Sequence, residues 1–163
     1  MIYRKFYTLT ISFFGHRQIF NSEKVRNKLY NYLKQRLKDV IARVLVGTHG
    51  DFDRLAFGVC KQLKREGYNI DISLVYTSQK QLTKDMDLDK YLGEYKDIEV
   101  VMYEIENEHY KRQIIISNHK MVDQSDEVVV YYTGKPQWQL HNGTRRIVQY
   151  CKTKNRFVTN IYD

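Results

Sequence analysis

The sequence predicts an α/β domain in which a mostly parallel sheet of about six strands carries helices on both faces. Short apolar segments of strand length alternate along the chain with segments whose apolar residues recur at helical spacing. The 163 residues suit one domain with a substantial core, and they contain no repeat, low-complexity tract or interdomain linker. Residues 1–163 are therefore expected to form a single domain.

Runs of apolar and β-branched residues mark the expected strands. The segment from Met1 to Ile11 has an apolar part too short and too polar for a signal peptide, and it is interpreted as strand. The run over residues 127–133 is apolar at successive positions, which is typical of a strand buried on both faces. The expected strands are Thr8–Phe14, a strand that ends at Val46, Ile70–Tyr76, Ile98–Tyr103, Glu127–Thr133 and Arg156–Ile161.

Between the expected strands, apolar residues recur at the spacing of helices. Apolar residues recur every four positions from Val25 to Leu37 among lysines and arginines, so the first helix is amphipathic with a basic outer side. Asn21 or Ser22 is expected to cap it. Residues 77–97 are expected to form an irregular acidic insertion that partly covers a site. Further helices are expected from about Phe52 to a stop at Gly67, from about His109 to Gln124, and from Asn142 to Lys154.

The charge is basic overall but unevenly distributed. The 27 Lys and Arg residues exceed the 19 Asp and Glu residues, which gives a net charge of +8. The net charge is +9 over residues 1–67, −6 over 68–109 and +5 over 110–163. The acidic middle excludes a uniform nucleic-acid-binding coat. The basic balance is compatible with an anionic ligand, with nucleic acid on the first helix, or with solvated helix faces.

Several classes of protein and site are disfavoured by what the sequence lacks. No run of 18 or more apolar residues occurs, so neither a transmembrane helix nor a membrane partner is expected. Cys60 and Cys151 fall on apolar faces of expected helices, as buried thiols do in a reducing compartment, which indicates a cytoplasmic location. No CxxC or HExxH metal spacing and no Ser-His-Asp or Cys-His set is identifiable. A homo-oligomer is left open.

Glycine-rich or polar turns follow three of the expected strands, and a similar turn opens the last helix. In a mostly parallel sheet such turns gather outside the carboxyl ends of the strands, where α/β proteins bind ligands. Helix N-termini there expose N–H groups and favour anions. Each turn alone is also an ordinary strand-to-helix connection, so their convergence carries the prediction. The turns are Gly15-His16-Arg17, Gly47-Thr48-His49-Gly50, Thr133-Gly134-Lys135 and Asn142-Gly143-Thr144.

The candidates in these turns have both a ligand role and a structural one. Arg17 is expected to grip a phosphate, with a surface ion pair as the alternative. His16 either donates to the phosphate or stabilises the turn. Asp53 either binds a ribose hydroxyl or acts as a helix-start carboxylate. The remaining candidates for contact with the ligand, mainly through the backbone, are Thr48, Gly50, Gly143 and Thr144, whereas Gly47 permits the turn.

Three further groups of residues have weaker signals. Tyr132 and Trp138 are candidates for stacking on a base. Asp126 precedes a strand, so it is expected to cap structure at the opposite edge of the sheet. The preferred interpretation of Glu104, Glu106 and Glu108 is a solvated acidic loop. The alternative is that they supply a general base.

Four short motifs occur in a fixed order along the chain: Phe14–Arg17, Val46–Ala56, Asn118–Asp126 and Asn142–Thr144. Together they resemble the YpsA-like branch of the SLOG superfamily, over about Leu9 to Ile161. The resemblance implies a three-layer Rossmann-like fold and a pocket for a nucleotide or nucleotide-derived ligand, to which Asn118 would contribute. The superfamily includes lysine-decarboxylase-like phosphoribohydrolases, DNA-processing protein A, and nucleotide sensors of bacterial and phage-linked defence systems.

Two departures from the family pattern bear on catalysis. Ser117 stands where relatives usually have an arginine before the matching asparagine. The phosphoribohydrolases carry Pro-Gly-Gly-x-Gly-Thr-x-x-Glu, and here Ile147 stands in place of that glutamate. We therefore expect a nucleotide-binding sensor or sequestering module rather than an enzyme, with no cofactor beyond that ligand. A nucleotide N-glycosidase and a single-stranded nucleic-acid-binding protein are the alternatives.

Overall fold

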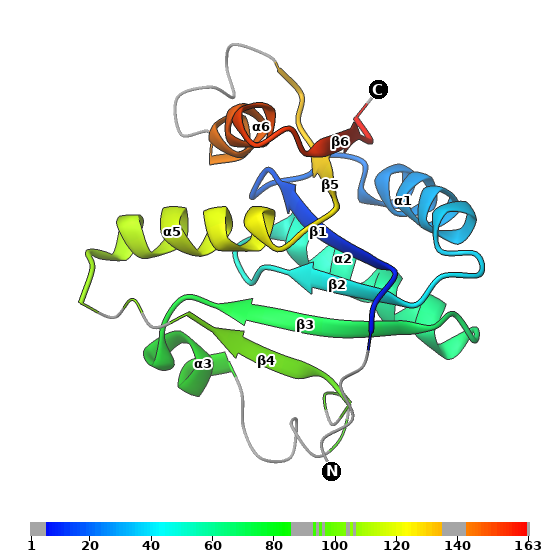
Figure 1. Cartoon of the computed structure of the whole chain (residues 1–163), viewed down its shortest axis with the longest axis horizontal. Coiled ribbons are helices and arrows are strands. Elements are labelled where there is room, and N and C mark those ends of the chain that lie inside the picture. Colours follow the sequence, from blue (N-terminus) through cyan, green and yellow to red (C-terminus); the bar gives the residue numbers. More distant parts are fainter. Residues whose placement is uncertain are drawn as a thin grey trace.

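Six parallel strands form the central sheet of the protein. The structure is a computed structural model, and it describes residues 6–85, 93, 95, 97–103, 105, 107–134 and 143–162. The strands are β1 (Leu9–Gly15), β2 (Ala42–Val46), β3 (Ile70–Tyr76), β4 (Glu99–Met102), β5 (Glu127–Tyr131) and β6 (Phe157–Asn160). The helices are α1 (Ser22–Arg36), α2 (Asp51–Arg65), α3 (Gln79–Asp85), α5 (Tyr110–Asp123) and α6 (Gly143–Thr153). The strand order is β4-β3-β2-β1-β5-β6 (Figure 1).

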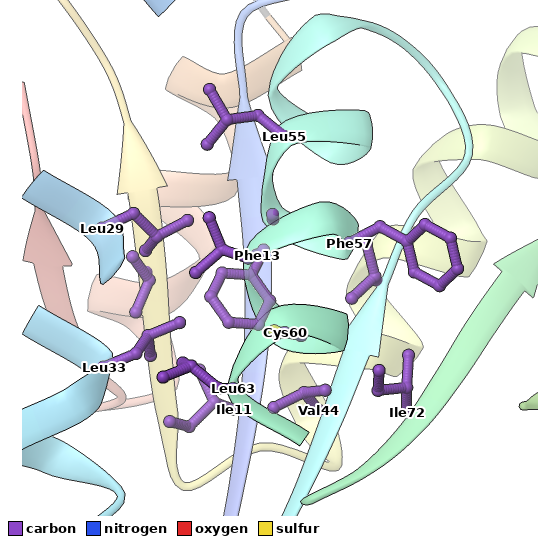
Figure 2. Packing of buried hydrophobic residues seen from close by; sticks show 14 of the residues in the cluster. Ile11, Phe13, Leu29, Leu33, Val44, Leu55, Phe57, Cys60, Leu63 and Ile72 are labelled. Carbon is purple, nitrogen blue, oxygen red and sulfur yellow. The ribbon is translucent and has the colours of Figure 1, made fainter. Parts of the chain in front are cut away.

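Helices cover both faces of this sheet. On one face α1 and α2 enclose the larger core cluster, in which Leu29 of α1 and Leu63 of α2 pack near Phe13 of β1 (Figure 2). On the other face α5 and α6 contribute Met121 and Ile147 to a second cluster. Burying one such side chain fully is worth on the order of 1.5–3 kcal/mol. The three layers and the parallel sheet confirm the predicted Rossmann-like α/β fold.

The apolar faces of the helices are those that the sequence spacing indicates. The positions of α2 that recur at helical spacing are at most 5 % exposed, and they are Leu55, Ala56, Val59, Cys60 and Leu63. Cys60 and Cys151 are both buried free thiols. Burial raises the pKa of Cys60 to about 12 and that of Cys151 to about 11. Both thiols therefore stay protonated and behave as small core residues.

The direction in which strands are added to the sheet reverses at β1. Strands β2, β3 and β4 follow on one side of β1, whereas β5 and β6 lie on the other side. In α/β sheets such a reversal leaves a crevice outside the carboxyl ends of the two strands concerned, and ligands bind there. Here the position at which such a crevice is expected is at the ends of β1 and β5, where Gly15 and Tyr131 are neighbours in the parallel register.

Two segments differ from the sequence prediction. The N-terminal strand begins only at Leu9, because Phe6 to Thr8 are not strand and residues 1–5 lie outside the described residues. Part of the predicted irregular insertion is the helix α3, and residues 86–92 of it lie outside the described residues. Helix α3 has no buried residue, so it lacks the apolar periodicity by which helices are predicted.

The ends of the elements agree with the prediction in part. Asn21 is the N-cap of α1, but its φ is 59° and its side chain makes no capping hydrogen bond, so the predicted side-chain cap is wrong. Gly67, with a φ of 100°, follows α2 as predicted. Asp126 has the predicted structural role, because its Oδ2 accepts a hydrogen bond from the N–H of Thr10 at 2.8 Å. None of the helices in the described residues combines the length and apolar character that crossing a bilayer requires.

Candidate functional site

The loops that follow β1, β2, β3 and β5 lie at the edge of the sheet toward which the strands point, and we call this edge the rim (Figure 1). Two rim loops are interlocked. The carbonyl of Arg17 accepts a hydrogen bond from the N–H of Asp51 at 2.9 Å. Gly50 has a φ of 125°, and a Cβ on it would lie 2.7 Å from the Cα of Arg17. Only glycine fits this position, so the turns after β1 and β2 form one unit.

Arg17 is an unpaired cation at the rim. Its side chain is exposed, and it has no ion pair or hydrogen bond with any of the described residues. Arg54, one turn into α2, instead pairs with Asp51 at 3.2 Å. Helix α2 has no side-chain cap, so the N–H groups of Phe52 and Asp53 remain as orphan donors of its first turn. A guanidinium and a helix N-terminus therefore lie side by side.

Gly15 at the end of β1 is required by packing. A Cβ on it would lie 2.4 Å from Cγ of Phe52. Phe52 is fully buried, and its ring stacks on that of Tyr131 with 6.0 Å between the centroids. The ends of β1 and β5 and the start of α2 thus form a packed floor beneath the crevice.

His16 occupies the crevice between β1 and β5. It is 9 % exposed, and its Nε2 accepts a hydrogen bond from the N–H of Thr133 at 3.0 Å. A nitrogen that accepts carries no proton, so the neutral ring has its proton on Nδ1. Burial lowers the pKa of His16. Of the two roles predicted for this residue, the structure shows the contact that stabilises the turn.

Asp53 lies inside the turn after β2. Its Oδ2 accepts a hydrogen bond from the N–H of His49 at 2.8 Å, and it lies 2.8 Å from where a Cβ on Gly47 would be. Gly47 therefore permits the turn by leaving room for the carboxylate. Burial raises the pKa of Asp53 to about 6, although the His49 N–H and two nearby arginines lower it. This contact corresponds to the predicted helix-start role.

A chain of hydrogen bonds joins the end of β2 to the end of β3. Thr48 Oγ1 donates to the carbonyl of Val75 at 3.0 Å and accepts from Gln81 Nε2 at 3.0 Å. Gln81 Oε1 accepts from the hydroxyl of Thr77 at 3.1 Å, and that hydroxyl lies 3.3 Å from His49 Nε2. The Thr48 side chain is thus part of the scaffold, and the imidazole of His49 is fixed at the rim.

His49 is the residue on which several elements converge. The ring of Tyr110, at the start of α5, meets it edge-on with 6.4 Å between the centroids. Burial and the charge of Arg17 lower the pKa of His49, while Asp85 of α3 raises it. His49 and His16 are therefore both neutral at neutral pH, whereas Arg17 places a positive charge near His49.

The remaining predicted site residues lie on α5, on α6 and after β5. Asn118 lies eight residues after Tyr110 in α5, about 12 Å along a helix that starts at the rim and runs away from it (Figure 1). Thr144 is buried in the first turn of α6, and Gly134 is exposed with a φ of 69°. Glu108 pairs with Arg112 at 3.0 Å. Several candidates lie outside the described residues: Lys135, Trp138, Asn142, Glu104 and Glu106.

Four residues of the cluster are absent from the sequence prediction: Asp51, Thr77, Gln81 and Tyr110. Thr77 directly follows a predicted strand and Gln81 comes four residues later, which is the spacing of neighbours on a helix face. The interpretation of residues 77–97 as irregular hides that signal. An acidic residue at a helix start indicates the position of Asp51. Tyr110 carries no signal among fourteen tyrosines.

The rim combines an arginine fork, a helix N-terminus, two neutral imidazoles and one enclosed carboxyl. Such a set suits a phosphate with polar neighbours. In the described part of the chain, no group of three or more His, Cys, Asp or Glu side chains could hold a metal ion. No known protein family matches the sequence, and no curated protein is a significant match to it.

Proposed function

We propose that the chain binds a nucleotide or a nucleotide-derived ligand at the rim and acts as a sensor or sequestering module. The observation that carries this proposal is the position of Arg17. Its backbone is fastened to the start of α2 through Asp51 and Gly50, while its guanidinium has no partner among the described residues. The side chain that grips the ligand is thereby held beside an uncapped helix N-terminus.

Charge and shape at the rim agree with such a ligand. A guanidinium presents a planar fork that matches phosphate oxygens, and the orphan N–H groups of Phe52 and Asp53 add donors of the kind that bind phosphate elsewhere. Tyr110 is 53 % exposed beside His49, so an aromatic face is available to a base. The resemblance to the YpsA-like branch of the SLOG superfamily supports the same ligand class, and a role in bacterial or phage defence belongs to this proposal.

Calorimetry with purified protein tests the proposal. The panel consists of nucleoside mono-, di- and triphosphates, cyclic nucleotides and ADP-ribose-derived nucleotides. Arg17→Ala is expected to weaken the best ligand by about 10- to 100-fold, because a hydrogen bond to a charged group is worth about 1.5–3 kcal/mol. Arg65→Ala, at the far end of α2, is the matched control and should leave the affinity unchanged. Failure of every ligand, or equal effects of the two substitutions, contradicts the proposal.

A nucleotide N-glycosidase is the second candidate, and Asp53 is the observation in its favour. Its carboxyl has a pKa raised to about 6 and lies at the rim, which suits a general acid or base near neutral pH. Release of free base from nucleoside monophosphates is the assay, with Asp53→Asn as the inactive comparison. Release no faster than in buffer would remove this candidate.

A further inference from the structure

The hydrogen bonds around Gln81 fix which way its amide faces. Its Nε2 lies 3.2 Å from the carbonyl oxygen of Thr48, and a carbonyl oxygen only accepts, so the nitrogen must be on that side. Its Oε1 then faces Thr77, where it accepts from the backbone N–H at 3.2 Å and from Oγ1 at 3.1 Å. The hydroxyl of Thr77 donates its single hydrogen to Gln81 Oε1, because turning that hydrogen toward His49 would leave the lone pairs of two oxygens facing each other at 3.1 Å.

The hydrogen bond from Thr77 to Gln81 sets the tautomer of the His49 ring. Its Nε2 lies 3.3 Å from Thr77 Oγ1, which has only lone pairs left, so Nε2 carries the proton and donates it. The neutral ring then has a bare Nδ1, and that atom has no hydrogen-bond partner among the described residues. The backbone N–H of His49 is held by Asp53, which fixes the base of the side chain.

Arg17 and His49 therefore require opposite hydrogen-bonding groups from a ligand. Arg17 offers only donors and requires an acceptor, whereas Nδ1 of His49 offers only a lone pair and requires a donor. Inorganic phosphate at neutral pH satisfies Arg17, but its only donors are P–OH groups on the same phosphorus that Arg17 binds. A nucleotide satisfies both, because hydroxyl and amino groups accompany its phosphate.

We infer that His49 determines ligand specificity, because its Nδ1 accepts a hydrogen bond from a ribose hydroxyl or base amino group of a nucleotide. Thr77 and Gln81 are positioning residues, since they hold the tautomer that this contact needs. The ligand contact rests on the proposed function, whereas the tautomer is a property of the protein alone. The two parts are therefore tested separately.

The tautomer is tested on the full chain without ligand. Long-range proton–nitrogen NMR correlations of labelled protein distinguish protonated from bare ring nitrogens, and His49→Gln identifies the signals of residue 49. We expect the ring proton of His49 on Nε2. The ring proton of His16 is expected on Nδ1, so His16 serves as a comparison within the same protein. Thr77→Val removes the accepting hydroxyl, so it should populate the other tautomer of His49 and leave His16 unchanged. A wild-type His49 with its proton on Nδ1 overturns the inference.

The ligand contact is tested by calorimetry with AMP, its 2′-deoxy and 3′-deoxy analogues, IMP and inorganic phosphate. We expect one missing donor to weaken binding by about tenfold, which corresponds to about 1.4 kcal/mol. This discrimination should disappear in His49→Gln and persist in His49→Asn, whose side-chain oxygen lies near the former Nδ1. Thr77→Val should weaken AMP by about twofold if half of the molecules then carry the wrong tautomer.

Each negative result has a separate meaning. If AMP binds equally well to the wild type and to His49→Gln, the inferred role of His49 is overturned and the proposed function still stands. No binding of AMP also overturns the contact, and the wider nucleotide panel then decides whether the proposed function stands.

Discussion

The carboxylate of Asp53 occupies the space that a side chain on Gly47 would need. Its Oδ2 lies 2.8 Å from the Cβ position of residue 47 and accepts the N–H of His49 at 2.8 Å. The carboxylate cannot move away without giving up this hydrogen bond. The turn, the start of α2 and the position of His49 therefore depend together on a residue without a side chain.

Gly47→Ala is expected to lower the free energy of unfolding by about 1–3 kcal/mol, because an extra methyl group must displace an enclosed, hydrogen-bonded carboxylate. Gly143→Ala is the matched control. No atom of the described residues lies within 4 Å of a Cβ at Gly143, so its effect should stay within about 0.5 kcal/mol. Urea unfolding followed by circular dichroism measures both. Equal stability of the two variants would show that Asp53 has room to move.

Asp53→Asn should be more stable than the wild type above neutral pH and lose that advantage in acid. The pKa of Asp53 is raised from 3.8 to about 6 on folding, so the native state binds its proton more tightly than the unfolded state does. The wild type therefore loses stability as the pH rises through this window, by up to about 3 kcal/mol, and the asparagine variant does not.

Urea unfolding of both proteins between about pH 4 and about pH 8 measures this difference. The variant keeps an amide oxygen that can accept the N–H of His49, so the turn should remain intact. A difference in stability that is independent of pH would show that Asp53 does not titrate in this window.

The fold was predictable because its signals are local. Apolar strand segments end at Gly15 and Val46, and the apolar spacing of α2 from Leu55 to Leu63 identifies its buried face without knowledge of its neighbours. Helix α3 was not predictable in this way, since six of its seven residues are polar and none is buried. Its short length adds to this, because short helices leave little periodicity to detect.

The site was predictable only as a set of turns. The role of His16 depends on Thr133, which is 117 residues away and becomes a neighbour only because β5 lies beside β1. The tautomer of His49 depends on the helical spacing of Thr77 and Gln81. Neither contact follows from composition or periodicity, because the first depends on strand order and the second on a helix that apolar periodicity does not indicate.

His16→Leu should cost about 1–3 kcal/mol of stability near neutral pH, because it removes the acceptor of the Thr133 N–H. The loss of stability caused by His16→Leu should be smaller in acid. The pKa of His16 is lowered from 6.5 on folding, so the unfolded state binds the proton first, and the wild type loses stability as the pH falls below 6.5. The variant lacks this loss.

Denaturant unfolding at neutral pH and near pH 5 compares the two proteins. The pKa of His49 is also lowered, but His49 is present in both proteins, so its contribution cancels in the difference. A gap that widens in acid would show that the folded protein favours the protonated form of His16.

Ser12 and Ser125 are expected to be coupled energetically, because they share one acceptor in the core. Both are buried, and each hydroxyl contacts the carbonyl of Met121, at 3.1 Å from Ser12 and 2.7 Å from Ser125. The two hydroxyls also contact each other. Together they join β1 to the end of α5. Either alanine variant should cost about 1 kcal/mol, since the remaining serine still bonds the carbonyl.

A double-mutant cycle with Ser12→Ala and Ser125→Ala, followed by urea unfolding, measures the coupling. We expect the double variant to deviate from the sum of the single effects by about 0.5 kcal/mol or more, as residues of one hydrogen-bond network do. Thr153→Ala is the control, because its exposed hydroxyl bonds carbonyls within α6, and its effect should stay within about 0.5 kcal/mol. Strict additivity would mean that the two serines act independently, so that the hydrogen bond of one to the carbonyl of Met121 does not affect the hydrogen bond of the other.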